Sequence, residues 1–181
     1  FAESEYLIPE ILSKLKIHTD HLDEHHEMLF YYKFASIYFG NEKYTECIFY
    51  LDKIINNKNL SMREDLMCFA RILCLIAHYE LGQDYYLENQ LKNTYKFLIK
   101  MNDLHEVQKE IIKFMKNLNT IYPTDIKKEF VKMRARFIEL EKNTYEKRAF
   151  LYLDIISWLE SKIENRKISD IIKDKAKLIN R

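Results

Sequence analysis

The most hydrophobic stretch of the chain is residues 66–81, and only three polar side chains interrupt it: Arg71, His78 and Glu80. Sixteen residues are too many for a strand, and a charged arginine makes a membrane span unfavourable. A helix that is hydrophobic nearly all round is buried between neighbours. Ser61 and Glu64 form a capping-box pattern before it, and Gly82 can take the left-handed conformation that ends a helix. The pattern therefore predicts a central helix enclosed by other helices.

Hydrophobic side chains recur at helical spacing along the rest of the chain and predict eight further helices. Their spans are residues 6–16, 21–39, 43–56, 84–101, 104–118, 125–141, 145–164 and 168–179. Asp20 and Asp103 are placed to cap the helices that follow them. Because the polar loops between the helices are short, successive helices should lie antiparallel. The sequence therefore predicts an all-α fold of helical hairpins.

The composition supports this fold class. The chain has 181 residues, enough for one domain with a sizeable core, but only two Gly and two Pro. Sheets and their turns usually need more of both. The 13 Tyr and 11 Phe can fill many contacts between helices.

Two hairpins repeat. Tyr38 and Tyr44 recur as Tyr79 and Tyr85 at an offset of 41 residues. The first hairpin resembles a tetratricopeptide repeat at seven positions that alternate in size as that motif does: Tyr31, Phe34, Ala35, Tyr38, Cys47, Leu51 and Ile54. The 41-residue offset exceeds the usual repeat of about 34 residues. The resemblance covers about residues 28–100, and it implies a right-handed α-solenoid spanning residues 1–181 as one domain.

A second resemblance lies near the end of the chain. Residues 145–150 and 155–163 are similar to the C-terminal part of uncharacterised bacterial helical-repeat proteins. Those proteins are longer, and this chain begins with Phe1 rather than Met. The resemblance implies a C-terminal fragment of a longer bacterial protein, in which residues 168–179 cap the stack with a polar outer face.

Charge is unevenly distributed although the net charge is only +1. Residues 1–91 hold 8 basic and 15 acidic side chains, residues 92–136 hold 11 and 5, and residues 137–181 hold 10 and 8. Such asymmetry can orient a partner or a neighbouring copy of the chain. We therefore expect self-association to be one possible use of these surfaces.

The sequence contains no enzyme signature. Cys47, Cys68 and Cys74 are an odd number in apolar helical contexts, which argues against a disulfide framework and indicates a reducing, cytoplasmic location. Cys74 and His78 are one helical turn apart, so a thiol–imidazole pair is possible, but two core cysteines are the favoured interpretation. No glycine-rich phosphate loop, cofactor motif, signal peptide or membrane span is expected.

A histidine cluster is the candidate metal site. His21 and His25 have the spacing of two imidazoles on one metal ion, but a solvated helix start is favoured because no cysteine ligand joins them. We therefore predict no bound metal.

The predicted function is non-enzymatic binding of a partner protein, as a peptide or helix held in a concave groove. The candidate binding residues are Tyr31, Tyr38, Arg71, His78, Trp158, Lys92, Lys96 and Lys100. The alternative is nucleic-acid binding by the basic segment 92–136, with base stacking on Tyr95, Phe97 and Tyr122. The alternative is less favoured because the whole chain lacks a strong basic excess.

Overall fold

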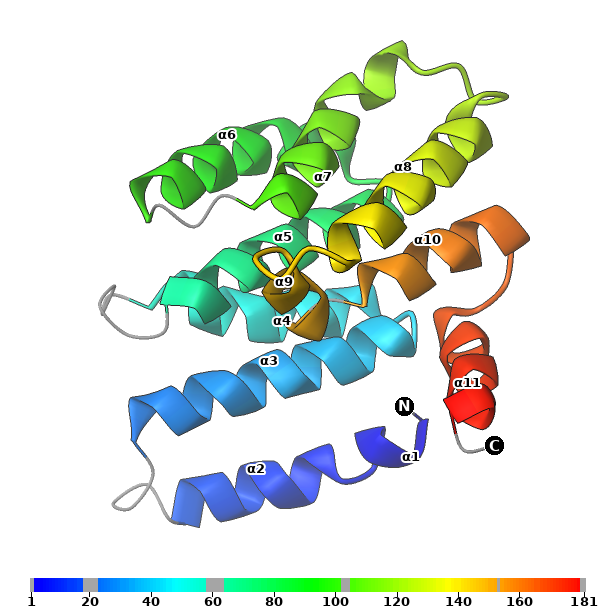
Figure 1. Ribbon diagram of the computed structural model, residues 1–181. Coiled ribbons are helices and arrows are strands. Elements are labelled where there is room, and N and C mark those ends of the chain that lie inside the picture. Colours follow the sequence, from blue (N-terminus) through cyan, green and yellow to red (C-terminus); the bar gives the residue numbers. More distant parts are fainter. Residues whose placement is uncertain (1, 18–22, 58–63, 102–104, 153, 180–181) are drawn as a thin grey trace. The chain divides into compact units, whose positions relative to one another are not determined.

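The computed structural model describes residues 2–17, 23–57, 64–101, 105–152 and 154–179, and within these ranges it contains helices and no strand (Figure 1). The predicted all-α class is confirmed. The elements are α1 (Ala2–Glu5), α2 (Ile8–Ile17), α3 (Glu24–Gly40), α4 (Tyr44–Ile55), α5 (Glu64–Glu80), α6 (Asp84–Lys100), α7 (Glu106–Asn117), a 3-10 turn η1 (Leu118–Thr120), α8 (Ile126–Glu141), α9 (Lys147–Tyr152), α10 (Ile155–Glu164) and α11 (Ile168–Ile179). None of the described helices is both long enough and apolar enough to cross a membrane.

The chain divides into two compact units, Phe1–Leu87 and Glu88–Arg181. Helix α6 begins in the first unit and continues into the second. The division separates the charge, because residues 1–87 carry 8 basic and 14 acidic side chains whereas residues 88–181 carry 21 and 14. The first unit therefore has a net charge of −6 and the second of +7.

In the first unit, α4 packs against α3 and α5, α5 also contacts α3, and α1 packs on α3. The predicted helix over residues 6–16 is instead two helices, since the chain turns at Tyr6 and Leu7 before Pro9 enters the first turn of α2. The cap of α3 is Asp23, whose carboxylate accepts the backbone N–H of His26 at 3.0 Å. The expected cap, Asp20, lies outside the described residues.

Helix α5 is the predicted central helix. Every side chain from Leu66 to His78 is buried except that of Arg71. The expected capping residue Ser61 lies outside the described residues, whereas Gly82 follows α5 with φ of 65°, as its position predicted. The periodicity of the apolar run thus identified the most buried helix of the chain.

Three helices end in the same turn. Glu42 after α3, Gly82 after α5 and Asn165 after α10 all have positive φ, at 60°, 65° and 54°. The next residue in each case donates its N–H to the carbonyl five positions earlier: Lys43 to Tyr38 at 2.9 Å, Gln83 to His78 at 3.1 Å and Arg166 to Ser161 at 3.0 Å. This pattern is the Schellman motif, which satisfies carbonyls at a helix end.

The turns correct the internal alignment of the repeat. Because Glu42 and Gly82 are equivalent, the two hairpins align at an offset of 40 residues rather than 41. Tyr38 therefore corresponds to His78 and not to Tyr79. Gly40, expected to end the second helix, is its last helical residue and is buried.

In the second unit, α8 and α11 both pack against α10, and α8 also contacts α7 and α9. The predicted helix over residues 145–164 is interrupted, because Asp154 leaves the helical conformation and accepts the N–H of Ser157 at 3.1 Å to cap α10. Helix α7 starts after His105, and the expected cap Asp103 lies outside the described residues. Helices α6, α8 and α11 match their predicted spans to within two residues.

Candidate partner-binding surfaces

Tyr31 and Tyr38, two turns apart on α3, converge on Tyr50 of α4. The ring centroids of Tyr31 and Tyr50 are 6.0 Å apart, and those of Tyr38 and Tyr50 are 5.6 Å apart with the planes inclined by only 8°. Tyr50 is buried, whereas the two α3 tyrosines remain half-buried. Two of the candidates named from the sequence are therefore joined through a third ring on the neighbouring helix.

Phe49 extends this cluster into solvent. Its ring meets the edge of Tyr50 at 5.1 Å, and 58% of the residue is exposed. The Lys53 ammonium lies 4.8 Å above the Phe49 ring and 5.4 Å from the Tyr31 ring, a cation–π arrangement. We call Tyr31, Tyr38, Phe49, Tyr50 and Lys53 the α3–α4 aromatic surface.

The sequence analysis did not include Phe49, Tyr50 or Lys53 among the candidate residues, although two consecutive aromatic residues on a helix were visible. The phenol of Tyr31 donates to the Glu27 carboxylate one turn earlier. Burial raises the pKa of Tyr31, and the negative charge of Glu27 raises it further, so this phenol is neutral at physiological pH. The surface therefore offers neutral rings and phenolic hydroxyls.

Arg71 and His78 have structural contacts. Arg71 Nη2 donates to the carbonyl of Ile55 at 3.2 Å, which satisfies a group at the C-terminus of α4. His78 Nδ1 and Gln83 Oε1 are 2.7 Å apart, across the turn that ends α5. Both side chains hold helix ends together, and we do not retain them in the proposed binding surface.

Trp158 belongs to the core of the second unit. Only 1% of it is exposed, and its ring meets that of Phe130 edge to face at 5.6 Å. A side chain so enclosed by its own unit is not available to a partner, so the sequence-based assignment of Trp158 to a binding surface is corrected.

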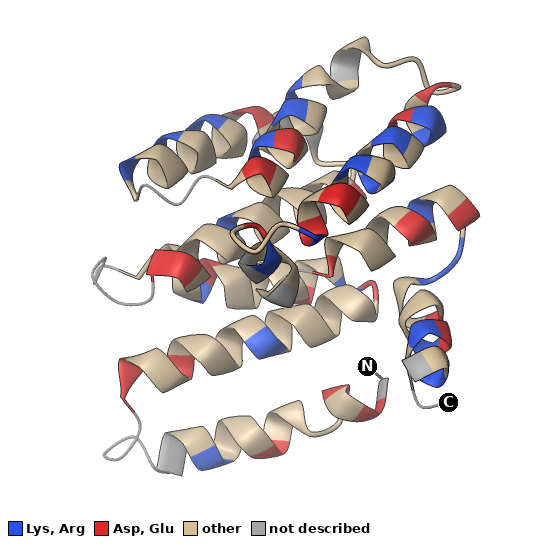
Figure 2. Ribbon diagram, viewed as in Figure 1, with Lys and Arg blue, Asp and Glu red and all other residues tan. Residues whose placement is uncertain are grey.

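Lys92, Lys96 and Lys100 lie exposed along one side of α6, where Figure 2 shows a run of basic positions. Lys92 pairs with Glu88 at 2.7 Å. Lys96 and Lys100 have no carboxylate partner among the residues that the structure describes. Tyr95 and Ile99 lie beside these lysines and are 38% and 53% exposed. We call these five residues the α6 basic face.

The stacking role expected of Tyr95 meets a specific obstacle. Lys116 Nζ of α7 lies 4.6 Å above the Tyr95 ring, which occupies the face that a base would need. Phe97 is half-buried, and Tyr122 alone of the three candidates is largely exposed, at 75%. The basic segment therefore supplies cations in greater number than accessible stacking platforms.

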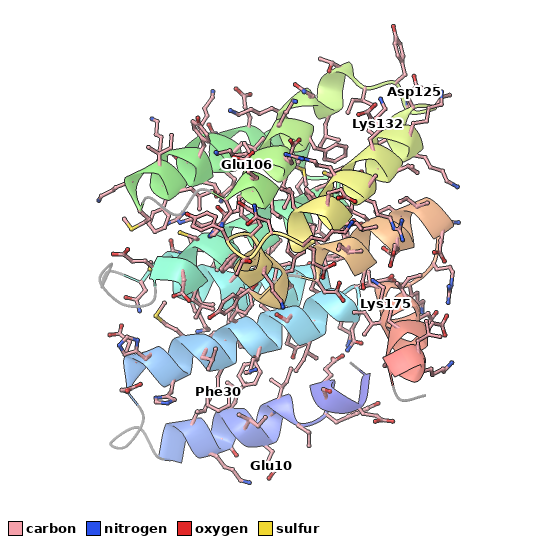
Figure 3. The ribbon with its side chains drawn as sticks, in the orientation of Figure 1. Glu10, Phe30, Glu106, Asp125, Lys132 and Lys175 are labelled. Atoms are coloured by element: carbon pink, nitrogen blue, oxygen red, sulfur yellow. The ribbon has the colours of Figure 1, made fainter. Side chains whose placement is uncertain are left out.

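Several cations of the segment 92–136 are already paired with carboxylates one turn away on the same helix. The pairs are Lys109–Glu106 at 2.6 Å, Lys128–Asp125 at 2.7 Å and Lys132–Glu129 at 2.6 Å. Figure 3 shows Asp125 and Lys132 near the start of α8. Such exposed pairs contribute little to stability, but they reduce the local positive field.

The cysteines are all free and buried. Burial raises the pKa of Cys74 to about 12, with a further contribution from the charge of Asp52, and burial also raises the pKa of Cys47. A nucleophilic cysteine requires the opposite shift. The thiol–imidazole arrangement considered from the sequence is therefore not supported by the environment of Cys74.

The histidine cluster is only partly described. His25 and His26 are exposed, and His26 Nδ1 lies 2.6 Å from Asp23. His18 and His21 lie outside the described residues. Within the described ranges, no group of three or more His, Cys, Asp or Glu side chains is arranged to hold a metal ion.

Two buried carboxylates of the second unit were not anticipated. Glu146, 2% exposed, accepts the N–H groups of Glu106 at 3.0 Å and Val107 at 3.3 Å, so it caps α7 from 40 residues away. Its Oε1 also lies 3.8 Å from His105 Nδ1. An acidic group at a helix N-terminus is stabilised by the helix dipole.

Glu160 of α10 connects three helices. Its carboxylate binds Arg134 of α8 at 2.6 Å and Lys175 of α11 at 2.7 Å, and Lys175 also donates to Ser157 at 2.8 Å. Burial alone would raise the pKa of Glu160, but the two cations outweigh it and the pKa is lowered. Lys175 is labelled in Figure 3 at the start of the red-coloured helix.

Comparison with protein-family models, curated proteins and solved structures gives no significant match. The tetratricopeptide resemblance therefore stays a prediction from the residues that carry it.

Proposed function

We propose that the protein is a non-enzymatic interaction module that binds an extended peptide or a helix of a partner protein at the α3–α4 aromatic surface. The observation that carries the proposal is the convergence of Tyr31 and Tyr38 on Tyr50, beside the exposed ring of Phe49. Aromatic side chains are enriched at the centres of protein interfaces and contribute much of their binding energy.

The arrangement of the rings favours this use. Tyrosine and phenylalanine have only two side-chain torsions, and here the rings hold one another in place, so little conformational entropy is lost when a partner binds. The hydroxyls of the tyrosines supply hydrogen bonds that orient a peptide backbone. Lys53, held over Phe49, favours a partner segment that combines an apolar side chain with a carboxylate.

The test compares partners recovered by the wild-type chain and by Phe49→Ser. The expected result is that a protein recovered by the wild type is lost, or bound at least about tenfold more weakly, when the exposed ring is removed. Tyr122→Ser is the matched control, because it removes an exposed ring from the second unit. Equal recovery by all three chains would contradict the proposal.

A second candidate function is nucleic-acid binding by the segment 92–136. The exposed lysines of the α6 basic face favour it, as does the net charge of +7 on residues 88–181. Fluorescence anisotropy with labelled single-stranded and double-stranded oligonucleotides tests it. Binding that falls steeply with salt and is lost in Lys96→Glu/Lys100→Glu would favour this candidate over the first.

The repeat architecture and the location are part of the same proposal. The tetratricopeptide-like right-handed solenoid is supported by the equivalent turns after α3 and α5, and by the packing of α5 on both helices of the preceding hairpin. A cytoplasmic location in a bacterium is supported by three free cysteines and by the resemblance of residues 145–163 to bacterial helical-repeat proteins.

A further inference from the structure

Helix α4 exposes an acidic face around one hydrophobic side chain. Phe49 has Glu46 one turn before it and Asp52 one turn after it, and all three are exposed. The turn that precedes α4 adds Glu42. Glu42 and Glu46 have no ion-pair partner among the described residues. With Lys53 the only exposed cation beside Phe49 on this part of α4, the face has a net charge of −2.

The α6 basic face has the complementary composition. Ile99, 53% exposed, stands beside Lys96 and Lys100, just as Phe49, 58% exposed, stands among carboxylates. Each face therefore consists of one apolar anchor surrounded by charges of a single dominant sign. The two faces also lie in units of opposite net charge, −6 for residues 1–87 and +7 for residues 88–181.

We propose that two copies of the chain associate through the acidic face of α4 in one copy and the α6 basic face of the other. The occupant is a second copy because this chain itself carries both complementary surfaces. Phe49 and Ile99 are withdrawn from water in the contact, and the uncompensated charges of each face are neutralised. A twofold arrangement forms the contact twice and gives a dimer, whereas an arrangement that does not close gives longer assemblies.

The self-contact goes beyond the proposed function and shares Phe49 and Lys53 with the α3–α4 aromatic surface. A partner bound at Phe49 therefore competes with a second copy. The two proposals are tested separately, because self-association is measured on the purified chain with no partner present.

The experiment is sedimentation velocity over a concentration series. The wild-type chain is expected to associate, and the association should weaken as salt rises, because screening shortens from about 10 Å at 0.1 M to about 3 Å at 1 M ionic strength. Lys96→Glu/Lys100→Glu places like charges opposite each other and should weaken association at least about tenfold. Glu42→Lys/Glu46→Lys should have the same effect from the other side.

Mixing the two variants is the decisive measurement. Each variant repels a copy of itself, but the reversed α6 face of one matches the reversed α4 face of the other, and the remaining pair of faces is wild type. Association should therefore return in the mixture. Lys113→Glu/Lys127→Glu changes the net charge equally on α7 and α8 and is the control, expected to associate as the wild type does.

Circular dichroism verifies that each variant folds. A wild-type chain that stays monomeric at every concentration and salt would overturn the proposal. Variants that associate normally, a mixture that stays dissociated, or a control that fails to associate would each do the same, because none follows from a contact between these two faces.

Discussion

Glu42 and Gly82 occupy the same position of the same helix-ending turn, with φ angles of 60° and 65°. Only glycine takes this conformation without steric cost, so the first hairpin contains a strained residue where the second has a suitable one. Asn165, in the equivalent turn after α10, is a side chain that tolerates the left-handed region. The repeat is thus better preserved in its backbone than in its sequence.

Substitutions at the two turns should have opposite effects on stability. Glu42→Gly should stabilise the chain by about 1 kcal/mol because it removes the Cβ clash of a left-handed residue. Gly82→Ala should destabilise it by about 1 kcal/mol. An added Cβ at Gly82 meets no atom within 4 Å, so the whole effect is conformational. Urea denaturation of each variant measures both values; changes of equal sign would contradict the equivalence of the turns.

The ion network around Glu160 should make stability depend on pH. The folded-state pKa of Glu160 is lowered by Lys175 and Arg134 against the effect of burial. Its contribution is therefore fully present above the unfolded pKa of about 4.3 and is lost as pH falls through the lower folded-state value. Glu160→Gln should destabilise the chain by about 1–3 kcal/mol near pH 7 and by less in acid.

The control for this prediction is Glu139→Gln, because Glu139 and its partner Lys142 are both exposed. It should change stability by less than about 0.5 kcal/mol. Thermal unfolding from pH 7 down to pH 3 measures both variants. A Glu160→Gln variant whose deficit stays constant over that range would show that the carboxylate charge is not what stabilises α8, α10 and α11.

Removal of the Glu146 carboxylate should loosen the start of α7. Glu146→Ala leaves the N–H groups of Glu106 and Val107 without their acceptor and should cost about 1–3 kcal/mol. Hydrogen exchange should quicken at these two amides more than at the amide of Ile111, in the middle of the helix. Uniformly faster exchange along α7 would indicate a general loss of packing and not the loss of a cap.

Charge reversal of the whole lysine row tests whether the α6 basic face binds any partner. Lys92→Glu/Lys96→Glu/Lys100→Glu should remain folded, because all three side chains are exposed and such changes usually cost little. Partner binding that uses this face should be lost, and in the wild type it should weaken as salt rises. An affinity unchanged by the triple substitution across a salt series would show that the row is only solvated surface.

The sequence determined much of the secondary structure by itself. The apolar run of residues 66–81 identified the buried helix α5, and Gly82 marked its end, because hydrophobic periodicity and helix-ending chemistry depend on neighbours only a few positions away. The same local signals gave α4, α6, α8 and α11 within two residues. They also placed Lys92, Lys96 and Lys100 on one exposed side of a helix, since that requires nothing beyond a four-residue spacing.

Tertiary structure alone decided which candidate residues stay accessible. Trp158 is buried because Phe130, 28 residues earlier, packs against its ring, and no local pattern contains that contact. The carboxylates of Glu146 and Glu160 are charged residues that a sequence places on the surface, yet distant N–H groups and cations allow them to be buried. Tyr31 and Tyr38 form one surface only because α4 brings Tyr50 between them. Exposure and side-chain partnership depend on what the fold brings together from distant parts of the chain, and spacing along one helix cannot supply it.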